Sequence, residues 1–223
     1  MKYQYLLFAA LLFSALHTGA QQQSRLISQM QLDYDNTAGF TPADSFTYKY
    51  SSGRGSDMKT GVYKYDTSVA MYFPSGSAKD TTRTLQDFYP DNKLKSIVRQ
   101  LVNSGGQFVN YQRTSYYYRS NGDMDSVLTD TWNGFNGSWA RSGRAKYSYN
   151  SAQKLSLYEG QTWDLSQYVT DHRIAYVYSG SDLVKTTEEL YDAPNTTWIG
   201  VAEHRYAYYV GGKLYSDLSL IHI

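Results

Sequence analysis

The hydrophobic and polar residues repeat with a period of about 30 residues in the second half of the chain. The anchors of the repeat are Phe108, Trp139, Tyr168 and Trp198, which lie 31, 29 and 30 residues apart. An aromatic pair follows eight and ten residues after each anchor, and an apolar residue follows about six residues after the second aromatic. The pairs are Tyr116 and Tyr118, Tyr147 and Tyr149, Tyr176 and Tyr178, and Tyr206 and Tyr208, and the apolar residues are Met124, Leu155, Val184 and Leu214. Such a period indicates one supersecondary unit per repeat.

Each period predicts one β-hairpin. Side chains at even spacings share one face of a strand, so Trp139, Tyr147 and Tyr149 are expected on one face. Arg144 and Lys146 are expected on the other face. The segments between the second tyrosine and the apolar residue are rich in Asn, Gly, Ser and Asp, which tolerate turn geometry. The expected return strands span residues 124–132, 155–163 and 183–191.

The repeat predicts an all-β fold, an antiparallel β-meander built from tandem hairpins of about 30 residues. Residues 84–217 are expected to carry the hairpins, and residues 21–83 an N-terminal cap or degenerate repeat region. A single hairpin is marginal in water, so each unit is expected to depend on its neighbours. The segment 94–102 has the apolar spacing of a helix face, but its register within the repeat favours a strand.

The stretch from the second tyrosine to the apolar residue resembles the YD-repeat family of Rhs-like proteins, whose core is Tyr-Asp-x-x-Gly-x-Leu. It stands here as "YRSNGDM" (118–124), "YNSAQKL" (149–155) and "YSGSDLV" (178–184), and as "YVGGKL" after Tyr208. Gly122 and Gly212 match the family glycine, whereas no unit has the aspartate. The tyrosine-rich chain also resembles secreted repeat proteins that are cargo of type IX secretion. These resemblances imply export and surface display, and no reaction.

Both ends of the sequence carry signals of their own. Residues 1–20 combine Lys2, an apolar run and small residues before Gln21, which predicts a signal peptide and export to the periplasm, the cell surface or the medium. The last six residues, "LSLIHI" (218–223), match the translation of a transposase adapter end used in sequencing libraries. We therefore expect residues 218–223 to be a non-native tail and the gene fragment to end near Asp217. The alternative is a genuine short hydrophobic tail.

Composition narrows the function classes. The absence of cysteine excludes disulfides, thiolate metal sites and a cysteine nucleophile. The formal net charge of +1, with lysine and arginine scattered, argues against nucleic acid or an anionic membrane as a partner. No segment after the N-terminal run approaches the roughly 18 apolar residues of a membrane helix, so no membrane insertion is expected. The 24 tyrosines against 8 phenylalanines favour strands whose faces are half-buried.

Titratable side chains give no clear catalytic or metal constellation. His172 and His204 are expected on strands about 10 Å apart, too far for a shared metal ion. Arg113, Arg144 and Arg173 recur five residues after the anchor aromatic. An arginine ladder can bind carboxylates or acidic sugars, but a solvated face is the favoured interpretation. We therefore predict no catalytic residue, no metal and no cofactor.

Large aromatic residues are expected to gather at the end of the hairpins opposite the tyrosine turns. Such a rim can stack on sugar rings or hold an extended peptide, and the alternative is packing between units. The sequence thus predicts an exported, non-enzymatic repeat protein for cell-surface display or for binding of glycan or protein. A fragment of a secreted carbohydrate-active enzyme is one alternative, and an outer-membrane β-barrel, against which the polar strand faces argue, is another. The rim residues are Trp132, Trp139, Trp163, Tyr168, Tyr191 and Trp198.

Overall fold

The computed structural model describes eight segments of the chain. All regular structure within them is β-strand, which confirms the all-β prediction. None of these residues forms a helix that is long and apolar enough to cross a membrane. Most of the predicted signal peptide, and residues 222–223 of the predicted tail, lie outside the described residues. The segments are residues 4–7, 28–35, 39–50, 56–57, 62–63, 65–72, 80–209 and 214–221.

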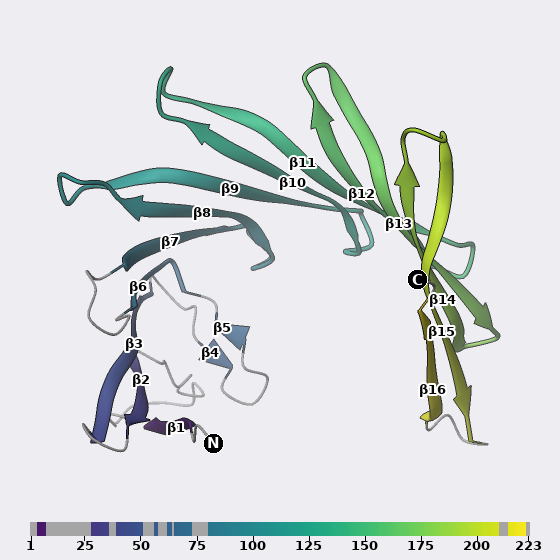
Figure 1. The fold of residues 1–223 in the computed structure, drawn as a ribbon, viewed down its shortest axis with the longest axis horizontal. Helices are drawn as coiled ribbons and strands as arrows, with labels where there is room; N and C mark the ends of the chain where they lie inside the picture. Colours follow the sequence, from purple (N-terminus) through teal and green to yellow (C-terminus); the bar gives the residue numbers. More distant parts are fainter. Residues whose placement is uncertain are drawn as a thin grey trace. The chain divides into compact units, whose positions relative to one another are not determined.

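The strands confirm the predicted meander. Fourteen of the described strands form one sheet in which neighbours follow chain order, and two others, β4 (Ser56–Asp57) and β5 (Val62–Tyr63), pair with each other. Every pairing between described strands with a defined register is antiparallel, and successive hairpins are visible in Figure 1. The chain divides into two compact units, residues 1–113 and 114–223, and each is described by itself.

The first unit confirms that residues 94–102 form a strand. Cross-strand partners of Ile97 and Val98 are Gln86 and Leu85, so these two apolar neighbours lie on opposite faces of β8 (Leu94–Val102). Apolar residues on both faces of a strand produce the spacing that resembles a helix face. The strands of this unit in the main sheet are β1 (Gln4–Leu7), β2 (Ser28–Asp35), β3 (Gly39–Lys49), β6 (Thr67–Tyr72), β7 (Asp80–Phe88), β8 (Leu94–Val102) and the start of β9 (Phe108–Tyr118).

The second unit contains the predicted hairpins, and each expected return strand is found to within one residue at either end. We call β11, β13 and β15 outgoing strands and β10, β12 and β14 return strands. The second tyrosine of a pair lies opposite an apolar residue, as in Tyr149 with Leu155 and Tyr208 with Leu214. The strands are β10 (Met124–Asn133), β11 (Ser138–Tyr149), β12 (Leu155–Asp164), β13 (Gln167–Ser179), β14 (Asp182–Asp192), β15 (Thr197–Tyr208) and β16 (Leu214–Ile221).

Turn chemistry explains where the hairpins reverse. In the turn 150–154 the backbone N–H of Asn150 donates to the carbonyl of Lys154 at 2.9 Å, and the Asn150 side chain accepts from the N–H of Ala152 at 3.0 Å. Gln153 has φ of 58°, the left-handed conformation that such a three-residue loop needs. The turn 119–123 has the same closing bond at 2.8 Å, with Gly122 at φ of 93°.

One extra residue in each outgoing strand changes which side chains share a face. Such a β-bulge shifts the alternation, so side chains before and after it exchange faces. Trp139 and Arg144 therefore lie on one face and Tyr147 on the other, whereas the even spacing had predicted that Trp139 and Tyr147 share a face. That prediction was wrong because it counted no bulge. The extra residues, which have no cross-strand partner, are Ser142, Asp171 and Val201.

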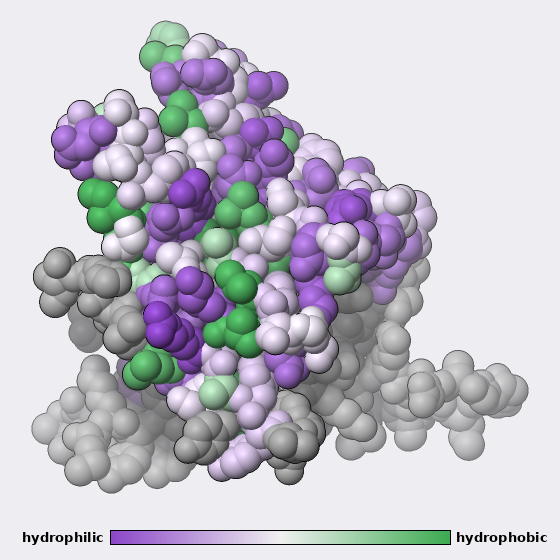
Figure 2. Space-filling view, turned by 90° about the vertical axis from the view of Figure 1, so that its right-hand side faces the viewer, coloured by the Kyte–Doolittle hydropathy of each residue, from purple (hydrophilic) through white to green (hydrophobic). Residues whose placement is uncertain are grey.

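The sheet buries few side chains. Among the described residues only Ser68, Asp130 and Thr186 are buried, and none is fully buried. Apolar side chains therefore remain partly in contact with water on both faces of the strands. In Figure 2 the hydrophobic residues form small patches separated by hydrophilic ones. This explains the excess of tyrosine over phenylalanine, because a tyrosine ring packs while its hydroxyl stays hydrated.

Candidate binding surfaces

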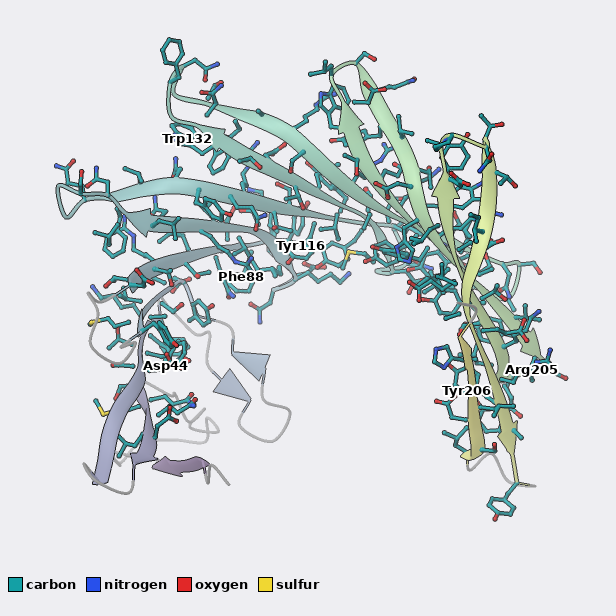
Figure 3. All side chains as sticks on the ribbon, viewed as in Figure 1. Asp44, Phe88, Tyr116, Trp132, Arg205 and Tyr206 are labelled. Carbon is teal, nitrogen blue, oxygen red and sulfur yellow. The ribbon has the colours of Figure 1, made fainter. Side chains whose placement is uncertain are left out.

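The predicted aromatic rim consists of three cross-strand pairs, one beside each turn that joins a return strand to the next outgoing strand. Trp132, the first member, lies close to the β10–β11 turn (Figure 3). Each pair packs edge to face or tilted, which is the favourable geometry for aromatic rings. The pairs are Trp132 with Trp139 at 5.1 Å between ring centroids, Trp163 with Tyr168 at 4.9 Å, and Tyr191 with Trp198 at 5.3 Å.

Arg173 holds three strands together on the face that carries these pairs. Its Nε donates to Oε2 of Glu189 on β14 at 2.6 Å, and its guanidinium carbon lies 4.1 Å from the ring centroid of Trp198 on β15. A charge-assisted hydrogen bond and a cation–π contact are both among the stronger polar interactions in proteins. The three side chains therefore fasten one hairpin to the next.

Arg144 makes the same arrangement one repeat earlier. Its Nε donates to Oε1 of Gln161 at 2.6 Å, and its guanidinium carbon lies 4.4 Å from the Tyr168 centroid. Arg144 and Arg173 are thus bound within the sheet, which corrects the prediction of a solvated face for these two arginines. We call this the arginine–aromatic face. The first unit repeats the motif with Arg83, Gln100 at 2.6 Å and Phe108 at 4.2 Å.

Glu203 replaces arginine at the equivalent position of β15. Its Oε1 accepts a hydrogen bond from Nε of Arg205 at 2.6 Å, and its Oε2 lies 3.5 Å from Nζ of Lys185. The hydrogen bond from Arg205 and the two nearby positive charges lower the pKa of the Glu203 carboxyl. The position therefore keeps a charged group of reversed sign, which Arg205 on the same strand and Lys185 on β14 neutralise.

The opposite face, which we call the tyrosine face, carries Tyr147, Tyr158, His172 and Tyr176. The rings of Tyr147 and Tyr158 lie 5.5 Å apart, and those of Tyr158 and His172 lie 5.6 Å apart. The imidazole of His172 packs over Gly160, where a Cβ would lie 3.4 Å from Nδ1, an ordinary van der Waals distance. Aromatic side chains thus cover the glycine backbone and form a row across three strands.

The two histidines do not form a common site. Nε2 of His172 lies 3.1 Å from Oε1 of Glu188, whereas Nδ1 of His204 lies 3.5 Å from Oδ1 of Asp217. Each imidazole thus pairs with a different carboxylate. In the described part of the chain, no group of three or more His, Cys, Asp or Glu side chains is arranged to hold a metal ion.

The second tyrosine of the repeat has a structural role that the sequence did not reveal. The Tyr149 hydroxyl donates to the carbonyl of Met124 at 2.8 Å, and the Tyr208 hydroxyl donates to the carbonyl of Leu183 at 2.9 Å. Each bond joins the end of an outgoing strand to the first residues of the preceding return strand. The recurrence of tyrosine at this position, where phenylalanine fits equally well by size, is the signal in the sequence.

Replacing Tyr149 with phenylalanine is expected to lower the free energy of unfolding by about 1 kcal/mol, because the Met124 carbonyl loses its donor while the ring stays in place. Urea denaturation followed by circular dichroism measures the loss. Tyr158→Phe is the matched control, since its hydroxyl makes no hydrogen bond to the described residues and its removal is expected to be nearly neutral. Equal losses for both variants would contradict the assignment.

Stability is expected to fall at alkaline pH. Burial, and then the neighbouring tyrosines, raise the pKa of Tyr147 and Tyr176 above the ordinary value of 10.0. A raised folded-state pKa contributes stability that is fully present below the unfolded pKa and is lost as pH rises through the folded pKa. Urea midpoints should therefore decline above pH of about 10. The double variant Tyr147→Phe, Tyr176→Phe should show a shallower decline, and an identical decline would refute this origin.

Comparisons with known proteins leave the family open. No family model matches the chain, and no curated protein matches it. A protein of unknown function from Bacteroides fragilis NCTC 9343 is 14% identical over 62% of this chain and 91% of its own, with a TM-score of 0.46. A DUF3836 family protein from Parabacteroides distasonis ATCC 8503 is 15% identical over 62% and 89%, with a TM-score of 0.24.

A third solved structure covers more of this chain and little of its own. It is a TcdB2-TccC3-Cdc42 complex, 12% identical over 90% of this chain and 11% of that one, with a TM-score of 0.36. Identities and TM-scores this low assign neither a family nor a function. Kinship with YD-repeat proteins and export by type IX secretion therefore stay predictions.

Proposed function

We propose that this chain is a non-catalytic binding protein of the cell surface that holds a glycan or a protein segment at its aromatic pairs. The observation that carries the proposal is recurrence: an aromatic pair stands at the same end, and on the same face, of three adjacent hairpins. Packing where one hairpin joins the next accounts for the presence of each single pair. A row of half-exposed pairs on one face also presents ring surface to a ligand.

The spacing of the pairs suits an extended ligand. Equivalent positions on adjacent hairpins are two strands apart, so the pairs are separated by at least about 10 Å and the three together span at least about 20 Å. An extended peptide of about six residues or more, or an oligosaccharide, can cover this length. Edge-to-face packing and the neighbouring arginines hold the rings in place, which reduces the entropy lost on binding. The guanidinium groups beside the rings add donors for hydroxyl or carboxylate oxygens.

Glycan and peptide arrays probed with the purified chain test this proposal. Binding is expected to be lost when Trp132, Trp139, Trp163 and Trp198 are changed to alanine, and to persist in Tyr147→Phe on the opposite face. Circular dichroism establishes that the alanine variant keeps its β-structure, and single Trp→Phe changes replace it if it does not. Binding that survives the loss of all four indoles would defeat the aromatic site. Hydrolysis of a polysaccharide by the purified chain would overturn the non-enzymatic assignment.

A further inference from the structure

Two turns at the aromatic end carry large apolar side chains that touch almost nothing. Phe135, in the β10–β11 turn, is 101% exposed, and Leu165, in the β12–β13 turn, is 95% exposed. Phe135 lies in the turn that follows Trp132, and Leu165 lies in the turn that follows Trp163. Each therefore stands at the tip of its turn, farther from the sheet than the aromatic pair. Neither side chain contributes packing to the fold.

Leu165 also has an unfavourable backbone conformation. Its φ is 48°, in the left-handed region that glycine and asparagine tolerate and that other residues adopt at a cost. A two-residue hairpin turn normally places Asn, Asp or Gly in this conformation. Leucine at this position therefore costs backbone energy and returns no packing energy. An outlier of this kind points to a role outside the folded chain.

Behind the tips, the strand ends themselves contain no basic residue, although the guanidinium groups of Arg141, Arg144 and Arg173 stack on their rings. The segments 131–140, 162–169 and 190–199 contain no lysine or arginine, and their only charged residues are Asp164 and Asp192. Leu190 and Ile199, cross-strand partners behind the Tyr191–Trp198 pair and on the opposite face, are nearly half exposed. We call these strand ends the tip band. From the turn tips to the level of Leu190 and Ile199 the band extends over three residue steps, about 10 Å.

We propose that this end of the hairpins dips into the headgroup region of a lipid bilayer. A docked protein covers one face of a sheet, whereas a bilayer surface surrounds tips and both faces to the same depth. Trp and Tyr favour the headgroup level, and peripheral elements enter the boundary by about 5–10 Å, which matches the band. The two aspartates of the band and Glu189, the partner of Arg173, offset the guanidinium groups that stack on its rings, so the band has no charge excess that would select an anionic lipid. The attachment is therefore expected with zwitterionic lipid.

Two turn tips in the headgroup region form a reversible peripheral attachment and do not insert the chain across the membrane. The attachment is carried by Phe135, Leu165 and the uncharged strand ends, and it does not rest on a glycan or peptide ligand. A ligand at the ring surfaces would then be held at the level of the membrane surface.

Flotation of the purified full chain with phosphatidylcholine vesicles tests the proposal. The chain is expected to float with these vesicles and to need no phosphatidylserine for binding. Phe135→Ser and Leu165→Asn are each expected to lower the partition about tenfold, since each removes a fully exposed large apolar group from the lipid-facing tips. Tryptophan emission should shift to shorter wavelength on vesicle addition to the unmodified chain, and less so for the variants.

The variants distinguish weaker vesicle binding from a damaged fold. Leu165→Asn suits the left-handed turn and is expected to raise the melting temperature while it weakens vesicle binding. Val177→Ser is the matched control, because Val177 is also exposed, at 44%, but lies near the other end of its hairpin, and its partition should be unchanged.

Several results would overturn the lipid attachment. They are no flotation with phosphatidylcholine, flotation that both tip variants retain in full, and flotation that requires phosphatidylserine. If the tryptophan emission shifts to shorter wavelength with a bound protein ligand and not with vesicles, the tips belong to a protein interface instead. If flotation fails while array binding persists, the lipid attachment is wrong and the proposed function stands.

Discussion

Replacing Arg173 with alanine is expected to lower the free energy of unfolding by about 2–4 kcal/mol, because the change removes a charge-assisted hydrogen bond and a cation–π interaction together. The half-buried Glu189 carboxylate is then left without its donor, and one side of the Trp198 ring is uncovered. Urea denaturation at neutral pH measures the destabilisation, and the slope of the transition shows whether the sheet still unfolds as one unit.

Arg205→Ala provides the matched control for this prediction. Arg205 also donates to a carboxylate at 2.6 Å, but its side chain is 62% exposed, so its removal is expected to cost about 0–1 kcal/mol. Arg173→Lys should recover only part of the stability, because an ammonium group lacks the planar guanidinium that bonds the carboxylate and stacks on the indole. Equal costs for Arg173→Ala and Arg205→Ala would show that the stacked geometry contributes nothing.

The hairpins could be predicted from the sequence because their signals are local. Tyrosine pairs, turn residues and the apolar residue six positions later recur at fixed offsets, and these offsets determine where strands begin and reverse. The strand 94–102 was predicted from register against its helical spacing. Its apolar residues serve two half-buried faces, and only comparison with the other repeats reveals this.

The faces could not be predicted in the same way. One bulge residue reverses the alternation, and Ser142, Asp171 and Val201 share no chemical property that marks them. A signal exists in strand length: β11 has 12 residues whereas the preceding β10, opposite its bulge, has 10, and β13 has 13 whereas the preceding β12 has 10. An outgoing strand longer than its partner has to accommodate extra residues.

The error about faces also hid part of the candidate site. Even spacing placed Arg144 on the face opposite the rim, so its stacking on Tyr168 was not expected. The gathering of aromatic residues near the turns was predicted, because it depends only on distance from the turns. The conformation of Leu165 was not predicted, since leucine seldom adopts positive φ and no sequence rule anticipates it.

Two kinds of cross-strand side-chain interaction recur along the meander, one on each face, and we call them the two recurring fastenings. On the arginine–aromatic face, an arginine joins its outgoing strand to the return strand and to the next outgoing strand. On the tyrosine face, a hydroxyl joins the end of an outgoing strand to the preceding return strand. Because the sheet buries no fully enclosed core in its described part, these repeated interactions replace a second layer as the source of order. Each hairpin should therefore be exchangeable for the next.

Deleting residues 149–177, which removes one period and joins Ser148 to Tyr178, is expected to leave a folded sheet that is shorter by one hairpin. Arg144 then takes the place of Arg173, opposite Glu189 and Trp198, and Ser142 takes the place of the bulge residue Asp171. Stability should fall by the contribution of one hairpin and its interface, more than for any single substitution. Circular dichroism and urea denaturation should still show β-structure and a cooperative transition.

A deletion of residues 149–176 supplies the control, because it keeps Val177 and shifts the register by one residue. Such a shift moves residues 138–148 by one position against β14 and so exchanges the faces that they share with it, and Arg144 no longer meets Glu189 and Trp198. We expect this chain to lose cooperative unfolding although it retains one more native residue. If both deletions behave alike, the hairpins are held by composition and general apolar packing, and the two recurring fastenings do not specify their register.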